Sequence, residues 1–486
     1  MNKGMKKRAS ALFLSLCIAI PVLSAQPAAV SAEDTTLRGD LNEDGVLTVD
    51  DVFWMQQYLL MTGGSFHSSC DFNADGQFNA KDLSLLKRYL MYKEPDPETE
   101  NAVLMVYMCG SDLETEAAEG IEDLYEMVKA DYSAENLTVV VMTGGAKDWH
   151  DPSITADQNY YVVIDHEGAY SDPVDGTQRY MSDPNTLEFF IRDTVQNYPA
   201  KHYALVMWDH GSGPIYGLCY DELSNSMLYL PGMCSALKNA GVHFDWIGFD
   251  CCLMGNTETA YAIRNYADYM IGSEESESGF GWRYDNFLSK WSAQPDMEVP
   301  QLAKIIIDDM TNVNRASWAE STLACYDLSK MDDLMQSYCA YINDVYQLCQ
   351  SRGIYYIQDA RGRCLDFGEG EFDLVDLGSL VQNLNADHTN DVLTAIQQTV
   401  IYNRSNRIQN PCGISVWFFE NYPEDGYYLL QEMFKGLGFS DDYLRQMRAM
   451  SKTALEIKTG HSVREVHLRT TEEILEVLRR FRQPVV

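Results

Sequence analysis

The stretch Tyr203-Ala204-Leu205-Val206-Met207-Trp208-Asp209-His210-Gly211 is followed, about forty residues later, by Phe244-Asp245-Trp246-Ile247-Gly248-Phe249-Asp250-Cys251-Cys252. Short apolar runs bounded by glycines and acids are typical of buried strands in a parallel sheet. In open α/β sheets, reactive groups collect at the carboxyl ends of the strands. We therefore expect His210 and a cysteine to face one another across a crevice. A thiolate nucleophile and its proton carrier need this arrangement.

The segments around these two runs predict an α/β domain. Apolar runs at 102–108, 137–142 and 160–164 read as further strands, with helices between them. This alternation predicts a three-layer αβα sandwich around a mostly parallel sheet. Ser111 and Glu114 have the spacing of a capping box at a helix start. A helix over 257–266 follows the cysteine, and its N-terminus is expected to lower the pKa of that thiol.

The C-terminal third predicts helices and connecting segments over 302–310, 331–348 and 374–403, and then a strand at 413–419. Residues 451–486 differ in carrying a slight excess of basic residues. They predict a helical tail of unassigned role, so we place the end of the α/β domain at residue 450.

The composition describes a chain of 486 residues with a net charge of −36 and 46% hydrophobic residues. This length predicts two or three domains with a sizeable core. The acidic balance argues against nucleic acid or an anionic membrane as a partner.

Residues 1–32 have the pattern of a secretory signal peptide, with a positive start, a short apolar core and small residues at two cleavage sites. No later run reaches the length of a membrane span. We therefore expect an exported protein, extracellular or attached to the cell surface. Of the twelve cysteines, eleven remain after loss of Cys17, so at least one thiol stays unpaired, and no CxxC spacing suggests zinc.

Residues 39–92 contain two twelve-residue loops, each followed by an amphipathic helix. Both loops carry oxygen ligands at positions 1, 3, 5, 9 and 12, glycine at position 6 and a carbonyl ligand at position 7, which is the pattern of a calcium loop. Two calcium ions are therefore predicted, with these ligands: Asp40, Asn42, Asp44, Val46, Thr48 and Asp51 in the first loop, and Asp71, Asn73, Asp75, Gln77, Asn79 and Asp82 in the second.

This pair of loops resembles a type I dockerin, a small all-α module that binds a cohesin on a scaffoldin or a cell-surface protein. The resemblance implies a cohesin partner, contacted through loop positions 10 and 11 (Val49-Asp50 and Ala80-Lys81) and the following helix. Residues 93–100, with two prolines and four acids, predict a linker.

From residue 101 to about 420 the chain resembles the clostripain family of cysteine peptidases, in the caspase-like group of folds. Four motifs carry the resemblance: Tyr107-Met108 with Ser111-Asp112-Leu113-Glu114; Asp209-His210-Gly211; Gly248 to Met254; and Gly272-Ser273-Glu274-Glu275. It implies a His210 proton carrier and a Cys252 nucleophile, although the adjacent Cys251 leaves the register open. It also implies an oxyanion site formed by the N–H groups of Gly211 and Cys252, without a third catalytic acid.

The same resemblance implies the substrate contacts. Asp250 corresponds to the acid at the floor of the pocket for the residue before the scissile bond (the S1 pocket), which implies cleavage after Arg or Lys. Glu274, Glu275 and Trp282 would line the cleft, with Trp282 either a pocket wall or a core residue. Asp209 and Asp245 are expected to be structural. The resemblance also allows further calcium in the peptidase domain.

The sequence thus predicts an exported cysteine endopeptidase over 101–450, docked through its dockerin and acting on peptides or proteins with a basic residue before the cut. The alternative is a catalytically inactive docking or adhesion protein on the same fold. A serine hydrolase is disfavoured because no G-x-S-x-G elbow occurs.

Overall fold

The computed structural model describes residues 38–42, 47, 49–60, 68–72, 78–91, 101–132, 136–419 and 434–460. It divides into two compact units, 1–94 and 95–486, and the boundary falls inside the predicted linker. The predicted signal peptide, Asp44, Val46, Thr48, Asn73, Asp75, Gln77 and residues 461–486 lie outside the described residues. In the described part of the chain, no helix has the length and apolarity needed to cross a membrane.

The N-terminal unit consists of helices α1 (Val49–Leu60) and α2 (Ala80–Met91) with a short 3-10 turn at Ser68–Cys70. Met55, Cys70 and Leu86 form its buried core. The two loop regions are joined by a hydrogen bond of 2.9 Å from the Gly39 N–H to the Ser69 carbonyl.

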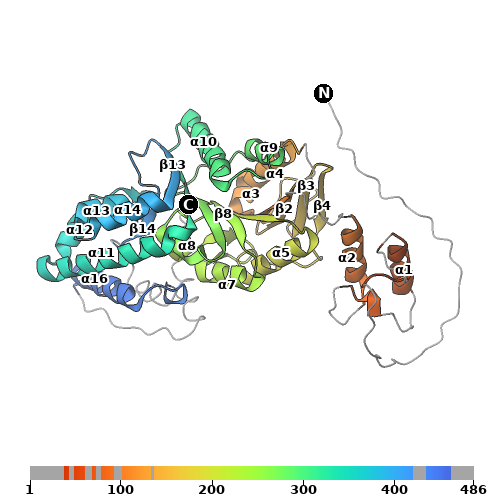
Figure 1. Ribbon diagram of the computed structural model, residues 1–486, viewed down its shortest axis with the longest axis horizontal. Coiled ribbons are helices and arrows are strands. Elements are labelled where there is room, and N and C mark those ends of the chain that lie inside the picture. The colour runs from red at the N-terminus through yellow and green to blue at the C-terminus, as the bar shows by residue number, and fades with distance from the viewer. Residues whose placement is uncertain are drawn as a thin grey trace. The chain divides into compact units, whose positions relative to one another are not determined.

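The second unit is built on a nine-stranded sheet (Figure 1). Its strand order is β13-β10-β9-β8-β5-β1-β2-β3-β4. The five central strands are parallel, namely β2 (Leu137–Gly144), β1 (Ala102–Cys109), β5 (His202–Trp208), β8 (Phe244–Asp250) and β9 (Ala267–Gly272). Antiparallel strands extend both edges: β3 (Tyr160–Asp165), β4 (Gly168–Pro173), β10 (Ser321–Asp327) and β13 (Val400–Asn406).

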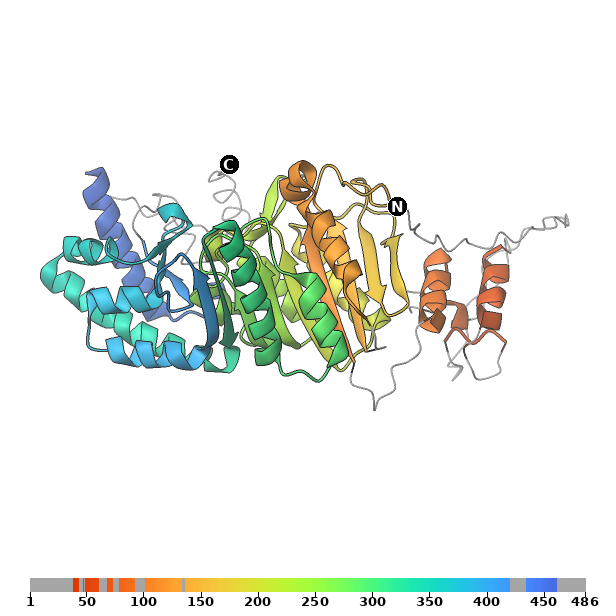
Figure 2. The ribbon, with the colours of Figure 1, turned by 90° about the horizontal axis from the view of Figure 1, so that it is seen from above.

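Helices cover both faces of this sheet, which explains why every residue of β1 is buried. One face carries α4 (Glu119–Lys129), α9 (Tyr284–Ala293) and α10 (Val299–Ser317), as Figure 2 shows, and their apolar side chains share one core cluster with the sheet. The other carries α5 (Pro184–Asn197), α7 (Leu230–Ala240) and α8 (Thr257–Ile263). The predicted three-layer αβα sandwich is confirmed.

The C-terminal third differs from the sequence prediction in detail. Residues 374–403 are not one helical region: they contain β12 (Leu374–Asp376), α13 (Leu377–Leu384), α14 (Thr389–Thr399) and the start of β13. The predicted strand at 413–419 is shortened to β14 (Ser415–Trp417), which forms a small sheet with β12 and β11 (Asp366–Phe367). Helices α11 (Met331–Arg352), α12 (Ile354–Arg361) and α16 (Asp441–Thr459) complete this region, and α16 continues across residue 450.

The predicted capping box at Ser111 is wrong. Helix α3 (Ser111–Ala117) has Gly110 as its N-cap, without a side-chain cap. Ser111 instead donates its hydroxyl to Asp209 at 2.5 Å, and Glu114 accepts the backbone N–H groups of Ile121 and His150. Both side chains are used for tertiary contacts because α3 is packed between two strand ends.

Candidate active site

The two central runs of the sequence become neighbouring strands, β5 and β8. Trp208 is paired with Asp250 in the parallel register. His210 and Cys252 therefore each lie two residues beyond a matched pair, at the same edge of the sheet. The sheet thus brings together a histidine and a cysteine from positions 42 residues apart in the sequence.

Gly211 brings the segment after β5 into direct contact with the segment after β8. A Cβ added at Gly211 would overlap the carbonyl oxygen of Cys252 and stand 3.0 Å from the Cβ of Cys251. Only glycine lets the backbone after His210 approach the backbone of Cys252 this closely. The same approach sets the Gly211 N–H beside the Cys252 sulfur.

The environment of Cys252 differs from the sequence expectation. The N-terminus of α8 begins at Thr257, capped by Asn256, and so lies five residues beyond Cys252 in the sequence. Burial raises the pKa of Cys252, and the backbone N–H groups of Glu277, at 3.2 Å from the sulfur, and of Gly211 oppose that rise. The thiol is therefore protonated at rest and needs a base to release its proton.

Cys251 has a different environment. Its side chain is 1% exposed, its sulfur contacts the Met207 carbonyl at 3.1 Å, and burial raises its pKa well above the usual value. Cys252 is only partly buried. The sulfur of Cys251 is thus enclosed by the core.

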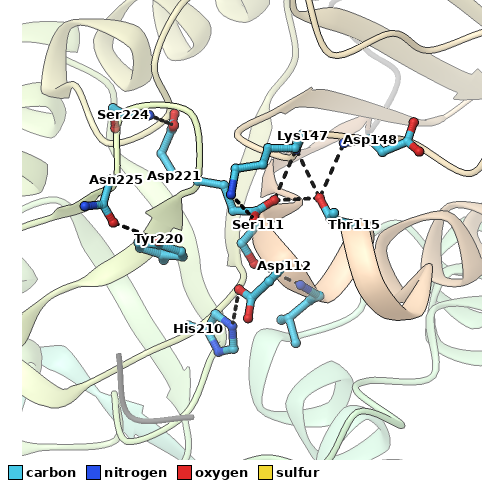
Figure 3. Close-up of polar contacts among 12 residues, drawn as sticks. Ser111, Asp112, Thr115, Lys147, Asp148, His210, Tyr220, Asp221, Ser224 and Asn225 are labelled. Carbon is cyan, nitrogen blue, oxygen red and sulfur yellow. Dashed lines mark hydrogen bonds and ion pairs between the residues drawn. The ribbon is translucent and has the colours of Figure 1, made fainter. Parts of the chain in front are cut away.

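His210 is held by a carboxylate that the sequence analysis did not single out as a site residue. Its Nε2 lies 3.0 Å from Oδ1 of Asp112, in the first turn of α3 (Figure 3). Burial alone would lower the pKa of His210, but the hydrogen bond to Asp112 and the charges of Asp209 and Asp112 raise it to about 9. The motif containing Asp112 was visible in the sequence, but nothing in a spacing of 98 residues predicts the contact.

Three acids, here called the acidic cluster, lie close to Cys252. Asp250 is 7% exposed, accepts the Tyr284 hydroxyl at 2.8 Å and has its pKa raised by burial to about 6. The Glu277 carboxyl is within hydrogen-bonding reach of Asp250, and both carboxyl oxygens of Glu277 are shielded from solvent. Asp123, which accepts the Trp208 indole N–H at 2.7 Å, is a third acid that acts electrostatically on Asp250.

Gly281 separates two of these acids. A Cβ there would lie 3.3 Å from Oδ2 of Asp123 and 3.8 Å from Oδ1 of Asp250. No ion pair within the described residues joins Asp123, Asp250 or Glu277 to a Lys or Arg. Asp123 was missed in the sequence because it lies inside helix α4, and Glu277 because it lies five residues beyond the end of β9 rather than directly at the strand end.

The other predicted substrate contacts are placed differently. The Trp282 side chain is fully buried, stacks on Trp246 with ring centroids 6.5 Å apart and belongs to the core. Glu274 is 1% exposed, so a substrate cannot reach its side chain. Glu275 is partly exposed, and its Oε1 accepts the Gly368 N–H at 3.0 Å.

Glu274 instead forms a buried cluster with Asp376 and Cys412, whose ligand atoms lie within 4.8 Å of one another. Four backbone N–H groups already point at these atoms, from Gly378, Ser379, Cys412 and Gly413. Burial raises the pKa of both Glu274 and Asp376. The cluster therefore fits a proton shared between two carboxyls better than a cation.

The described ligands of the predicted calcium loops have matching geometry. Asp51 and Asp82, at position 12 of each loop, are fully buried. Oδ1 of Asp51 accepts the Leu41 N–H at 2.8 Å, and Oδ1 of Asp82 accepts the Phe72 N–H at 3.0 Å, both at loop position 2. Buried, oriented carboxylates among oxygen donors fit calcium.

Comparison with known proteins identifies the family. Residues 106–451 match the model of the clostripain family. The chain belongs to this family. Residues 38–91 match the type I dockerin domain. Clostripain from Hathewaya histolytica is 25% identical over 273 residues, which is 48% of this chain and 51% of that protein. The chain thus spans about half the length of this curated relative.

Two solved structures of the clostripain family share the fold. An inactive zymogen C11 protease from Parabacteroides distasonis superimposes with a TM-score of 0.55 at 18% identity, covering 71% of this chain and 99% of that one. A secreted C11 cysteine protease from Bacteroides thetaiotaomicron, in complex with an irreversible peptide inhibitor, gives a TM-score of 0.54 at 19% identity, covering 70% and 99%.

Proposed function

We propose that this chain is an exported cysteine endopeptidase that cleaves peptide bonds after arginine or lysine. Family membership supports the reaction class. The observation that carries the proposal is the placement of Cys252 and His210 on adjacent strand ends, with Asp250 buried directly behind them.

In the reaction, His210 takes the proton of Cys252 and the thiolate attacks the scissile carbonyl. The N–H groups of Gly211 and Cys252 hold the resulting oxyanion. The imidazolium then protonates the leaving amine, and a water molecule hydrolyses the acyl-enzyme with His210 as its base. Cys252 is favoured over Cys251 as nucleophile because the Cys251 sulfur is enclosed by the core.

Specificity for basic side chains would rest on the acidic cluster of Asp123, Asp250 and Glu277, placed at the floor of the S1 pocket. Asp123, Asp250 and Glu277 are close enough for burial and mutual repulsion to raise their pKa values. A guanidinium or ammonium group entering this pocket relieves both costs, and arginine can pair with Asp250 through two hydrogen bonds. A neutral or acidic side chain offers no such compensation.

The N-terminal unit would attach the peptidase to a cohesin of a scaffoldin or cell-surface protein, outside the cell. The dockerin match and the two position-12 carboxylates support this role. Calcium would be held by the two loops, where it neutralises the converging carboxylates and fixes the loop ahead of each helix.

Peptide turnover tests the proposal. Residues 33–486 are assayed under reducing conditions with calcium on fluorogenic peptides that carry Arg, Lys, Asp or Ala before the bond. We expect turnover after Arg and Lys only, lost in Cys252→Ala and kept in Cys251→Ala. Absence of turnover by the folded protein would favour the non-catalytic docking protein.

A further inference from the structure

We propose that Asp112 is a positioning residue for His210 and makes the catalytic pair a Cys252–His210–Asp112 triad. The inference rests on the proposed peptidase function. It assigns a role to a carboxylate on α3, a helix outside the two strand-end motifs.

The contact between Asp112 and His210 is one of two adjacent links between the same segments. Ser111 donates its hydroxyl to Asp209 at 2.5 Å, and the next residue on each segment forms the Asp112–His210 contact at 3.0 Å. Ser111 and Asp209 are both buried, so the first link anchors the second. Figure 3 shows Asp112 directed at the His210 ring from the start of α3.

The contact fixes which ring nitrogen takes part in chemistry. Oδ1 of Asp112 accepts from Nε2, so neutral His210 keeps its proton on Nε2 and presents Nδ1 as the base. During acylation the thiol proton moves from Cys252 to Nδ1, and from Nδ1 to the leaving amine. The Nε2–H stays bonded to Asp112 throughout, so no proton is lost to the carboxylate.

The charge on Asp112 stabilises the imidazolium that forms in this step. The hydrogen bond to His210 lowers the pKa of Asp112, so the carboxylate stays ionised at neutral pH. The charged groups that act on His210 are Asp112 from α3 and Asp209 from the end of β5. Cys252 follows the adjacent strand β8. Asp209 is already bonded to Ser111, which leaves Asp112 as the group that orients the ring.

The side chains of Asp112 and His210 are 44% and 37% exposed, so solvent weakens the interaction. We therefore expect a loss of kcat/KM of about 10- to 100-fold in Asp112→Ala, below the roughly 10⁴-fold seen when a fully buried triad aspartate is changed. Asp112→Asn, which keeps an acceptor oxygen, should lose less than Asp112→Ala.

The decisive readout is a pH profile, because a merely structural role would not move it. His210 can take the thiol proton only when its ring is neutral, so the rise of kcat/KM with pH follows the pKa of His210, which is about 9 with Asp112 in place. Without Asp112 the imidazolium loses a stabilising charge and hydrogen bond, so the pKa of His210 falls and this limb moves to lower pH. The shift is expected to be largest in Asp112→Ala and smaller in Asp112→Asn.

The experiment measures kcat/KM on an Arg peptide from pH 5 to 10 and, independently of activity, the titration of the His210 ring by NMR of histidine-labelled protein, assigned with His210→Ala. Glu116→Gln removes a charge from the exposed side of α3 and is the matched control. Thermal unfolding verifies that each variant is folded.

A His210 titration and a kcat/KM limb that both move to lower pH in the Asp112 variants, with Glu116→Gln unchanged, support the triad. If the pH profiles of the Asp112 variants coincide with that of the parent protein, the triad proposal is overturned, even if kcat/KM falls. If the parent protein cleaves no basic peptide, the proposed specificity fails, but the titration of His210 still decides the role of Asp112.

Discussion

The backbone of Gly211 lies against the carbonyl oxygen of Cys252, with no room for a Cβ between them. This contact joins the histidine segment to the cysteine segment and sets the Gly211 N–H beside the reacting sulfur. The close approach of the two strand-end segments therefore depends on the absence of a side chain at Gly211.

Gly211→Ala should reduce kcat/KM by about 100-fold or more, since loss of one oxyanion donor alone costs about 10²- to 10³-fold. Steady-state kinetics on an Arg peptide measure the loss. Gly362→Ala is the control, because a Cβ there comes no closer than 3.5 Å to its nearest neighbour, the Gln358 carbonyl. Full activity in Gly211→Ala would mean that the two segments move apart without consequence.

Asp250→Asn should abolish the preference for basic residues. Removal of one partner of a buried charge pair costs about 2–5 kcal/mol, so kcat/KM for the Arg peptide should fall by roughly two to three orders of magnitude. Tyr284→Phe removes only the 2.8 Å hydrogen bond to Asp250 and should cause a smaller loss. Asp172→Asn, on the exposed strand β4, is the matched control. An unchanged ratio of Arg to Ala cleavage in Asp250→Asn would place the specificity elsewhere.

Glu258→Gln should flatten the pH dependence of stability. Glu258 is fully buried in α8, and burial raises its pKa from 4.5 to about 8, against the opposing hydrogen bonds from backbone N–H groups. Between these values the folded state keeps a proton that the unfolded chain releases. The free energy of unfolding therefore falls as pH rises, by about 1.4 kcal/mol per pH unit from this group.

Urea denaturation at pH 5 to 9 checks this prediction. The advantage of Glu258→Gln over the parent protein should grow up to about pH 8 and then level off. Parallel curves at all pH values would show that Glu258 is ionised in the folded protein.

Calcium titration by calorimetry should give two sites in the dockerin. Asp51→Ala and Asp82→Ala should each remove one, since each carboxylate is buried and organises its own loop. Asp50→Ala changes an adjacent acid outside the predicted ligand positions and should leave both sites intact. Two unaltered sites in Asp51→Ala would contradict the ligand assignment.

The sequence predicted the sandwich and the strand ends because buried parallel strands leave long apolar runs. The sequence analysis was wrong where the position of a side chain depends on tertiary contacts. Ser111 has a capping residue's sequence context, yet its hydroxyl is used by Asp209. The sequence does not decide between a pocket wall and a core residue for Trp282, which stacks on Trp246 in the core.

The acidic cluster and the contact between Asp112 and His210 could not be predicted from the sequence, and the reason is the same for both. Asp123 and Asp112 lie on helices whose own pattern gives no sign of a site. Each reaches the active site only because its helix packs beside the ends of β5 and β8. Their partners, Trp208 and His210, are 85 and 98 residues away in the sequence.

Covalent labelling tests the central claim most directly. The protein is treated with a peptide chloromethyl ketone bearing arginine next to the reactive group, and the modified residue is located by mass spectrometry. We predict a single thioether on Cys252, absent with the aspartate analogue and absent in Asp250→Asn. An adduct on Cys251, or equal labelling by the aspartate analogue, would contradict the account.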